Sequence, residues 1–406
     1  MPITINLKSA VFAVSDALDL VGVSDFQHGK RVAMIARETA LLLGLPEARL
    51  ENIVFAGLLH DMGVSSTTEH RRLVSDDPGV DRQAHCERAF HLMQPFAHLS
   101  LLANAVRHHH TPWSELPADL GEADAIDSNL ILLGDRVDTL LLRHGLENPL
   151  FHSTDICREI SALAGGVLRR EVVDAFLAAS ACEAFWISLV PRHVQSYLND
   201  LELPLWNVTI EFPQFRHVAR LISSIVDAKS HFTASHSLGV AQLSRYLGER
   251  MGFTPDALAK MEIAGLMHDI GKLCVPDEIV EKPARLTVAE FSVMERHSFE
   301  TYQILRHVPG LETVAEWAAF HHEALNGRGY PFRRSAPTLA PEARIVAVAD
   351  VFQALAQVRP YRGAQRLDEI SHTLGEFASK GILDPDIVAL ARDDLDRSLR
   401  AATQPV

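Results

Sequence analysis

The stretch TPDALAKMEIAGLMHDIGK, residues 254–272, decides the fold of this chain. Thr254 offers a hydroxyl that can cap a helix. Pro255 suits the first helical position, because its missing N–H is not needed there. Residues 257–267 are almost entirely apolar, which predicts a helix buried on most of its sides.

Two residues of metal-binding type, His268 and Asp269, end this helix, and Gly271 follows as the expected C-terminal cap. A buried carboxylate beside a buried imidazole is costly unless the two are paired or bound to a metal ion. One such pair is also compatible with an ordinary hydrogen-bonded core. The chain has 21 histidines, however, and the same half contains further residues of this type in helical, apolar settings: His236, His297, His321, His322 and Asp350. As a set, these residues predict a metal site.

The sequence contains an internal repeat. A shift of 208 residues aligns His28 with His236, His60 with His268 and Asp61 with Asp269; a shift of 212 aligns His85 with His297 and His109-His110 with His321-His322; a shift of 215 aligns Asp135 with Asp350. Loop insertions produce such a slow growth of the offset. The repeat predicts two related domains, residues 1–205 and residues 206–406.

Helical patterns run through nearly the whole chain. Residues 45–63 repeat the plan of residues 254–272, and residues 151–207 are helical in pattern to about residue 199. The best short strand candidate is VTIEF, residues 208–212. The expected fold class is therefore all-α, with two helical bundles in tandem and few or no strands.

The composition limits the class of protein and its partners. Hydrophobic residues make up 47% of the 406 residues and charged residues 22%, which is ordinary for a soluble globular protein. No apolar run reaches the roughly 20 residues that cross a bilayer, and the N-terminus lacks the features of a signal peptide. The four cysteines are scattered without a C-x-x-C pair, which indicates neither a disulfide framework nor a zinc knuckle. We expect a cytoplasmic protein that does not contact membranes.

The net charge of −14 argues against polymeric nucleic acid as a partner. Binding to DNA or long RNA relies on a basic surface that neutralises phosphates. A small phosphorylated ligand needs only a few local cations, so this class of ligand stays open.

The C-terminal half resembles the HD-GYP family of phosphodiesterases in the order and spacing of its motifs. These are His236, His268-Asp269-Ile270-Gly271-Lys272, His297, His321-His322-Glu323, Gly329-Tyr330-Pro331 and Asp350. The resemblance runs from about residue 227 to residue 364. It implies an all-α HD bundle that hydrolyses cyclic dinucleotides, chiefly cyclic di-GMP, with two or three bridged metal ions, commonly iron or manganese.

The resemblance implies one metal centre in this half, with the ligands His236, His268, Asp269, His297, His321, His322 and Asp350. Asp269 would bridge two ions, and Asp269 and Lys272 would be the catalytic residues, the lysine holding a phosphate oxygen. Phe232 stands where family members with a third metal have a glutamate, so we expect two divalent ions. Iron or manganese is favoured, and the ligand types also suit cobalt or zinc.

The same resemblance and the local chemistry suggest a set of substrate contacts: Lys272, Arg328, Tyr330, Arg333, Arg359 and Arg362. Arginines can grip phosphates with two hydrogen bonds, and glycines in the loop allow its backbone to approach a ligand closely. Stacking of Tyr330 on a base and simple packing are equally compatible with the sequence.

The first half has its own complete set of candidate ligands: His28, His60, Asp61, His85, His109, His110 and Asp135. It resembles a divergent HD domain, and we expect it to bind metal too. Val64 stands in place of Lys272, and Thr111-Pro112-Trp113 follows the paired histidines in place of the Gly-Tyr-Pro motif. These differences argue against turnover of cyclic dinucleotides there, and leave regulation, homodimer formation or action on another phosphate ester as alternatives.

The favoured interpretation is therefore a cyclic-dinucleotide phosphodiesterase, with cyclic di-GMP and 3′,3′-cyclic GMP-AMP both open as substrates. One alternative is an HD-type nucleotide phosphohydrolase, against which the loop at Gly329-Tyr330-Pro331 argues. Another is a metal-bearing receptor for cyclic dinucleotides that does not turn them over. A complete ligand set together with Lys272 argues against a pure receptor.

Overall fold

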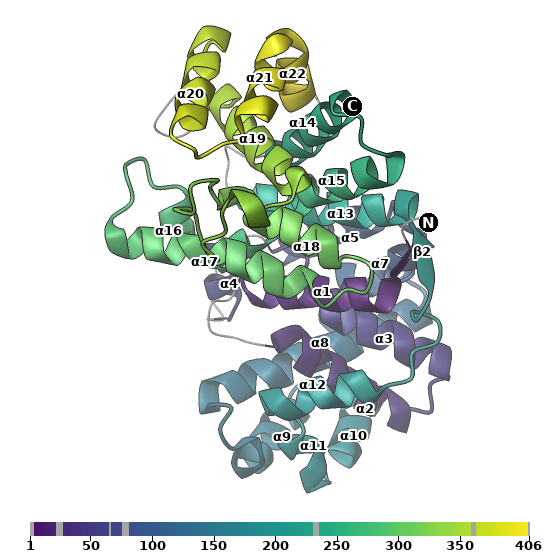
Figure 1. Cartoon of the computed structure of the whole chain (residues 1–406). Helices are drawn as coiled ribbons and strands as arrows, with labels where there is room; N and C mark the ends of the chain where they lie inside the picture. Colours follow the sequence, from purple (N-terminus) through teal and green to yellow (C-terminus); the bar gives the residue numbers. More distant parts are fainter. Residues whose placement is uncertain are drawn as a thin grey trace. The chain divides into compact units, whose positions relative to one another are not determined.

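The computed structural model describes residues 4–21, 27–64, 66–74, 81–229, 235–358 and 363–404. Helices make up most of these ranges, as Figure 1 shows, so the predicted all-α class is confirmed. The only named strands among the described residues are β1 (Thr4–Asn6) and β2 (Thr209–Glu211), which pair antiparallel with Ile5 opposite Ile210. β2 lies within the predicted strand at residues 208–212.

The chain forms two compact units. One unit comprises Val14–Val64 and Thr68–Val208 and is called the N-terminal unit; the other comprises Met1–Ala13, Ser65–Thr67 and Thr209–Val406 and is called the C-terminal unit. The first residues of the chain therefore join the C-terminal unit, where β1 pairs with β2. Two helices include residues of both units: α1 (Leu7–Asp19) and α4 (Thr67–Val74).

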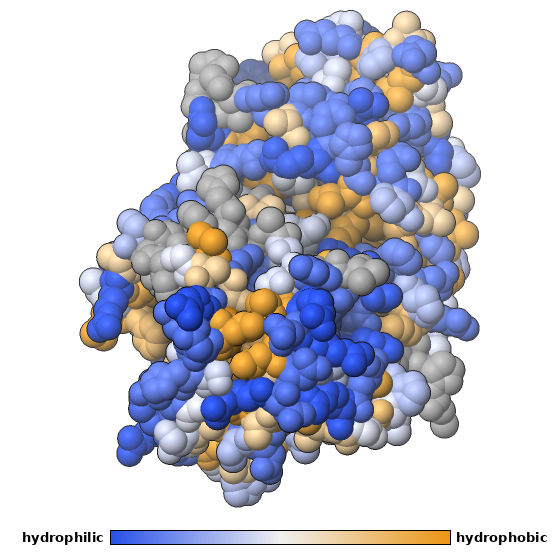
Figure 2. All heavy atoms as spheres, turned by 90° about the horizontal axis from the view of Figure 1, so that it is seen from above, coloured by the Kyte–Doolittle hydropathy of each residue, from blue (hydrophilic) through white to orange (hydrophobic). Residues whose placement is uncertain are grey.

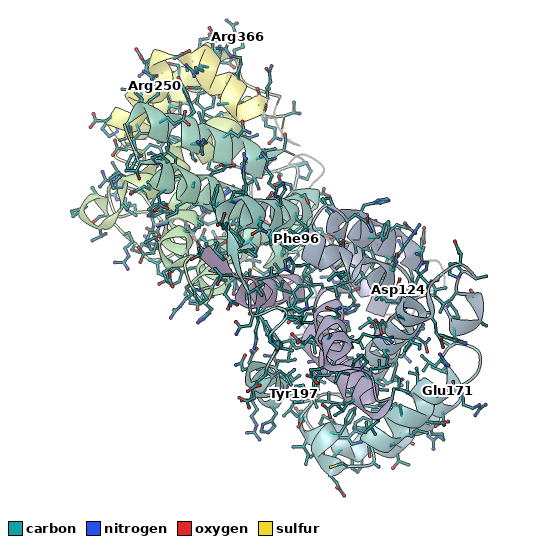
Figure 3. The ribbon with its side chains drawn as sticks, turned by 90° about the vertical axis from the view of Figure 1, so that its right-hand side faces the viewer. Phe96, Asp124, Glu171, Tyr197, Arg250 and Arg366 are labelled. Carbon is teal, nitrogen blue, oxygen red and sulfur yellow. The ribbon has the colours of Figure 1, made fainter. Side chains whose placement is uncertain are left out.

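The N-terminal unit is built around α2 (His28–Leu42), which packs against α3 (Glu47–Leu59), α8 (Glu122–His144) and α10 (Arg170–Ala179). Its last helix, α12 (Pro191–Asp200), is joined to α2 by Tyr197 (Figure 3), whose hydroxyl donates to Glu38 and accepts from Arg37. The remaining elements are α5 (Arg82–Met93), α6 (Ala97–Ser100), α7 (Ala103–Arg107), η1 (Trp113–Glu115), η2 (Pro149–His152), α9 (Ser153–Ser161) and α11 (Glu183–Ile187).

The C-terminal unit is built around α14 (His236–Arg250), which packs against α15 (Pro255–Met267), α19 (Pro341–Ala356) and α22 (Leu395–Thr403). The Thr254 hydroxyl accepts the Ala257 N–H at 3.3 Å, which confirms the predicted cap of α15. The remaining elements are α13 (Phe212–Ala228), η3 (Ile270–Cys274), α16 (Asp277–Val280), α17 (Val288–Leu305), α18 (Glu312–Ala319), η4 (Phe320–His322), η5 (Ala336–Thr338), α20 (Leu367–Ser379) and α21 (Pro385–Asp393).

Two glycines at equivalent positions of the repeat, Gly57 and Gly265, show that α3 packs on α2 in the same way as α15 packs on α14. A Cβ added at Gly57 would lie 2.6 Å from Cα of Ala33, and one added at Gly265 would lie 2.5 Å from Cα of Ala241. Both distances are far below van der Waals contact. The backbones of α2 and α3, and of α14 and α15, therefore touch at equivalent positions.

The predicted capping role of Gly271 is wrong. Helix α15 ends at Met267, His268 occupies the C-cap position, and Gly271 lies within the following turn η3. A Cβ on Gly271 would lie 2.0 Å from the carbonyl oxygen of His297. The glycine is needed because the backbone of α17 passes this close to the turn, a tertiary contact that local sequence signals do not report.

Among the described residues, no helix is both long and apolar enough to cross a bilayer. Polar residues cover most of the face shown in Figure 2, and apolar residues form smaller patches between them.

Candidate metal centres

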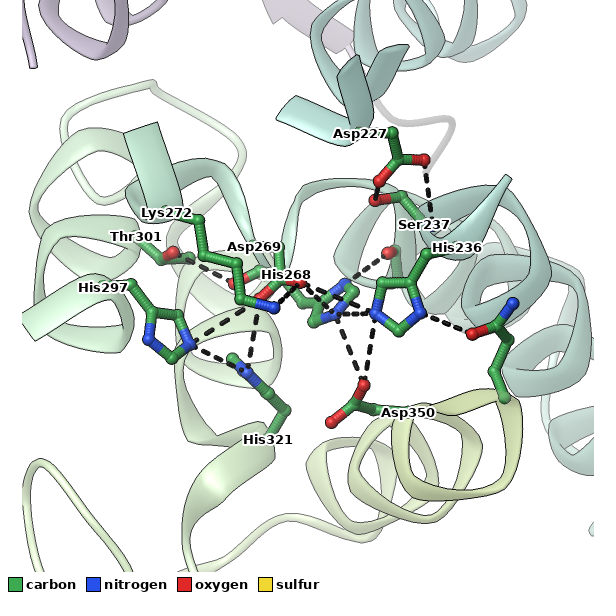
Figure 4. A network of polar contacts seen from close by, with 12 residues as sticks. Asp227, His236, Ser237, His268, Asp269, Lys272, His297, Thr301, His321 and Asp350 are labelled. Carbon is green, nitrogen blue, oxygen red and sulfur yellow. Dashed lines mark hydrogen bonds and ion pairs between the residues drawn. The ribbon is translucent and has the colours of Figure 1, made fainter. Parts of the chain in front are cut away.

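The seven predicted ligands of the C-terminal unit lie together, although they come from five segments. His236 is the first residue of α14, His268 and Asp269 follow α15, and His297 lies in α17. The paired histidines end η4, and Asp350 lies in α19. Six of the seven are buried. Figure 4 shows the side chains of all but His322 gathered around Asp269.

Hydrogen bonds fix the backbone at the start of α14, which carries His236, and in the turn after α15, which carries His268 and Asp269. Asp227 accepts from the N–H and the hydroxyl of Ser237 at 3.2 and 2.8 Å, which fixes the start of α14 beside His236. The hydroxyl of Thr301, in α17, donates to the carbonyl of His268 at 3.0 Å and accepts from the N–H of Gly271 at 3.1 Å. These contacts tie the turn after α15 to α17.

Asp269 lies between two groups of imidazoles. Its Oδ2 is 3.2 Å from Nε2 of His268 and 3.5 Å from Nε2 of His236. Its Oδ1 is 3.6 Å from Nε2 of His297 and 3.7 Å from Nε2 of His321. One carboxylate therefore faces two ligand groups, one oxygen toward each, which is the geometry of a bridging ligand.

The first group is completed by Asp350, whose Oδ1 lies 3.3 Å from Nε2 of His236. The second group is completed by His322, because His297, His321 and His322 offer ligand atoms within 4.8 Å of one another. The cluster is thus divided into two subsites that share Asp269.

The ring nitrogens are oriented as metal ligands require. Nδ1 of three histidines lies against the backbone carbonyl three residues earlier: His268 to Gly265 at 2.8 Å, His297 to Met294 at 2.6 Å and His321 to Ala318 at 2.7 Å. Since a carbonyl only accepts, each Nδ1 carries a proton, which leaves Nε2 as the ring atom that faces the centre and can bind a metal ion. Two pairs of these nitrogens approach closely, His236 with His268 at 3.2 Å and His297 with His321 at 3.3 Å.

This donor set fits divalent metal ions. Lone pairs that face each other repel unless a cation or a proton lies between them. The buried Oδ1 of Asp269 accepts no hydrogen bond from the described residues, although an unsatisfied buried carboxylate oxygen is costly. A cation in each subsite would satisfy both the nitrogens and this oxygen.

The charge states favour metal binding as well. Burial lowers the pKa of His297 to about 3 and that of His322 to about 4, so both rings are neutral near pH 7. Burial raises the pKa of Asp269, but His268 and Lys272 more than offset it and leave that pKa well below its usual value. Burial lowers the pKa of His236, yet Asp269 and Asp350 raise it to about 9. Neutral imidazoles and ionised carboxylates are the forms that bind metals, so His236 would release a proton when a metal ion binds.

Of the predicted substrate contacts, Lys272 lies at the centre, where its Nζ donates to Oδ2 of Asp269 (Figure 4). Arg328 and Arg333 are exposed on the loop that follows η4. Arg359, Arg362 and Phe232 lie outside the described residues.

Tyr330 packs against the cluster. Its ring centroid is 4.8 Å from that of His322, and its N–H donates to the His322 carbonyl at 3.1 Å. The loop is held by Glu323, which accepts the N–H groups of Phe332 and Arg334 at 2.7 and 2.8 Å. A loop pinned in this way keeps Tyr330 beside a predicted ligand.

The N-terminal unit repeats the arrangement around Asp61. Oδ2 of Asp61 lies 3.5 Å from Nε2 of His60 and 3.7 Å from Nε2 of His28, while Oδ1 lies 3.4 Å from His85 and 3.8 Å from His109. Asp135 and His110 join the set. The seven predicted ligands thus converge here too, and buried Val64 stands where Lys272 stands in the C-terminal unit.

Two stretches of the chain match family models described as HD domain, residues 25–140 and residues 220–387. Over 389 residues the chain is 35% identical to "3'3'-cGAMP-specific phosphodiesterase 1" of Vibrio cholerae serotype O1. The aligned stretch covers 94% of this chain and 90% of that relative. The chain belongs to the HD-GYP phosphodiesterase family. This membership confirms the predicted family, the tandem HD domains and the enzyme class.

Other HD-GYP relatives match smaller parts of the chain. "3'3'-cGAMP-specific phosphodiesterase 3" of the same organism is 29% identical over 276 residues, 68% of this chain and 58% of that protein. "Cyclic di-GMP phosphodiesterase" of Thermotoga maritima is 33% identical over 249 residues, 59% of this chain and 67% of that protein. The crystal structure of a cyclic GMP-AMP specific phosphodiesterase of Vibrio cholerae has a TM-score of 0.68 at 22% identity and covers 99% of both chains, which supports the HD-GYP fold.

The sequence did not indicate the residues behind the first ligand of each HD domain. Nδ1 of His236 lies 2.5 Å from Oε1 of Gln353, and Nδ1 of His28 lies 2.6 Å from Oδ2 of Asp138. Asp138 and Gln353 share the 215-residue offset that relates Asp135 to Asp350. The repeat therefore relates Asp138 to Gln353, but glutamine is not a typical metal ligand, so the offset alone does not mark these two residues as part of a metal site.

Proposed function

We propose that the C-terminal centre hydrolyses a phosphodiester bond of a cyclic dinucleotide, with 3′,3′-cyclic GMP-AMP as the preferred substrate. The observation that carries the chemistry is the position of the Asp269 carboxylate. Each of its two oxygens faces a separate group of imidazoles, and Lys272 donates a hydrogen bond to one of these oxygens, Oδ2. The base preference rests on the 35% identity to a relative with that named specificity over nearly the whole chain.

Two divalent ions, iron or manganese by preference, would occupy the subsites. His236, His268 and Asp350 would hold one ion; His297, His321 and His322 would hold the other; Asp269 would bridge them. When bound, such a pair supplies a hydroxide at neutral pH and neutralises charge on the phosphodiester. The proposal of two ions follows from Phe232, which cannot serve as a further ligand.

The residues of the chain would orient the reactants and stabilise charge. In the net reaction one water molecule would be divided between the products: its OH group would end on phosphorus, the bond from phosphorus to the 3′ oxygen would break, and the remaining proton would pass to that oxygen. The product would be a linear dinucleotide with a 5′-phosphate. Lys272 is 22% exposed, so its ammonium can reach a phosphate oxygen while remaining beside Asp269. A fixed cation at this place would stabilise the negative charge that develops in the transition state.

Arg328, Arg333, Arg359 and Arg362 remain proposed phosphate contacts. Arg328 and Arg333 are exposed on the loop that also carries Tyr330, so a substrate at the centre would lie next to them. Exposed guanidinium groups keep their donors free for a ligand and lose little solvation until it binds.

The N-terminal centre is proposed to bind metal without turning over cyclic dinucleotides. Its ligand geometry matches that of the C-terminal centre, but Val64 provides no cation for a phosphate oxygen.

The test is an anaerobic preparation loaded with iron or manganese and assayed by chromatography against 3′,3′-cyclic GMP-AMP and cyclic di-GMP. Asp269→Ala should abolish product formation while binding of the intact cyclic dinucleotide persists. The matched change in the other domain, Asp61→Ala, should leave turnover unaffected. Binding without turnover by the wild-type chain would favour a receptor, and turnover of nucleoside triphosphates instead would favour a nucleotide phosphohydrolase.

A further inference from the structure

The two centres differ in the group that supports their first histidine. His236 is supported by the neutral amide of Gln353, whereas His28 is supported by the carboxylate of Asp138. Both partners lie three residues after the predicted aspartate ligand on α19 or α8. The supporting residue therefore occupies the same position in both units, but it is negatively charged in the N-terminal unit and neutral in the C-terminal unit.

A second difference accompanies the first. Arg31 of α2 donates through Nη2 to Oδ2 of Asp138 at 3.0 Å and through Nε to Oδ1. Both side chains are fully buried, at 0% exposure. A buried carboxylate of this kind is costly without a partner, and the guanidinium supplies one: it shares Oδ2 with His28 and also donates to Oδ1.

The C-terminal unit cannot hold such an arginine. Gly239 stands at the position equivalent to Arg31, and a Cβ there would lie 2.1 Å from the carbonyl oxygen of Ala402 in α22. Packing of α22 on α14 thus excludes any side chain at this place. The cation and the carboxylate occur together in one unit and are both absent from the equivalent positions of the other.

Such a partner strengthens a metal site. A carboxylate that accepts the Nδ1 proton of a ligating histidine fixes the ring and makes its other nitrogen a stronger donor, and loss of such a partner typically costs about 10- to 100-fold in metal affinity. A hydrogen bond to a carboxylate is also about twice as strong as one between neutral groups. Arg31 fixes the carboxylate in turn through hydrogen bonds to both of its oxygens.

We infer that Arg31 and Asp138 give the N-terminal centre a higher metal affinity than the C-terminal centre, whose first histidine is supported by Gln353. The inference rests on the proposed metal binding of the N-terminal unit, and not on the proposed turnover. Asp138 is a positioning residue that acts through His28.

The test compares the centres one at a time with manganese as the probe. Alanine replaces His268 and Asp269 in one variant and His60 and Asp61 in the other, so that each retains one intact centre. Both are loaded with Mn²⁺ and dialysed against increasing chelator, and manganese per chain is measured by elemental analysis. The variant with the N-terminal centre should retain its metal at a chelator concentration at least tenfold higher than the variant with the C-terminal centre.

Asp138→Asn in the first variant should lower manganese affinity by about 10- to 100-fold, and the matched Gln353→Ala in the second should lower it less. Because Asp138→Asn removes the negative charge that Asp138 places beside buried Arg31, the neutral pair Arg31→Met with Asp138→Gln is made alongside, and folding is checked by circular dichroism. The neutral pair should fold and show the same loss of affinity.

Equal chelator resistance of the two centres would overturn the inference, as would an N-terminal centre that takes up no manganese or that is indifferent to both changes at Asp138. Turnover of cyclic dinucleotides is assayed separately on the wild-type chain. Intact turnover beside a weak N-terminal centre would refute this inference alone.

Discussion

Asp269 and His297 lie on different segments, and Oδ1 of the carboxylate is 3.6 Å from Nε2 of the imidazole. The contact depends on the close passage of α17 over the turn at Gly271, where a Cβ would lie 2.0 Å from the His297 carbonyl oxygen. Gly63 meets His85 in the same way in the N-terminal unit, also at 2.0 Å. The same glycine contact thus places His297 beside Asp269 and His85 beside Asp61.

Gly271→Ala should therefore separate α17 from Asp269. We expect a loss of about 1–3 kcal/mol in the free energy of unfolding of the C-terminal unit, as for other overpacked sites, together with a large loss of turnover. Chemical denaturation and the chromatographic assay measure the two effects. Gly63→Ala is the matched control, which should destabilise the N-terminal unit and spare turnover; an active, fully stable Gly271→Ala chain would contradict the account of this contact.

Lys272→Ala should reduce kcat by about 10²- to 10³-fold, the usual loss when one group that stabilises a developing charge is removed. Metal content should persist, because the seven predicted ligands do not include the lysine. Steady-state kinetics and elemental analysis on the same preparation separate the two. Loss of metal in parallel with activity would show that the lysine instead supports the centre through Asp269.

Tyr330 packs on His322 with ring centroids 4.8 Å apart, so its role can be divided between packing and substrate contact. Tyr330→Phe keeps the ring and should retain metal and most of the turnover. Tyr330→Ala should lower metal retention, because it removes the ring that holds His322. If Tyr330→Ala instead keeps its metal and raises only KM, the ring acts on the substrate.

Asp19 should make the stability of the metal-free N-terminal unit depend on pH. Burial raises the pKa of Asp19 from its ordinary 3.8 to about 7, where the carboxylate accepts the N–H of Gln27 at 3.0 Å. A carboxyl whose folded pKa is raised favours the folded state most at low pH, and this contribution decreases as pH rises from about 4 to about 7 and is constant above. Relative to wild type, Asp19→Asn should thus gain stability across that interval, as measured by denaturation midpoints at several pH values. A constant difference would refute the assignment.

Local signals in the sequence were sufficient for most of the fold and for the composition of both centres. The Thr254-Pro255 helix start, the apolar run after it and the repeated order of histidines and aspartates are short-range features. Helix caps and helical periodicity depend on neighbours within one or two turns, and a duplicated ligand set shows itself as a repeat in the order of residues alone. The strand at β2 could be predicted for the same reason.

The tertiary structure alone decided how these residues act on one another. Packing between helices that are distant in sequence decides which oxygen of Asp269 faces which histidines. It also decides why Gly271 has no side chain and why Arg31 lies beside Asp138. Such contacts form only when the apolar faces of the helices are buried together, and a sequence pattern carries no measure of the distances that result. The amino-acid sequence therefore determined the helices and the set of candidate ligands, and the packed bundle determined the division of each centre into two subsites and the partner that stands behind each first histidine.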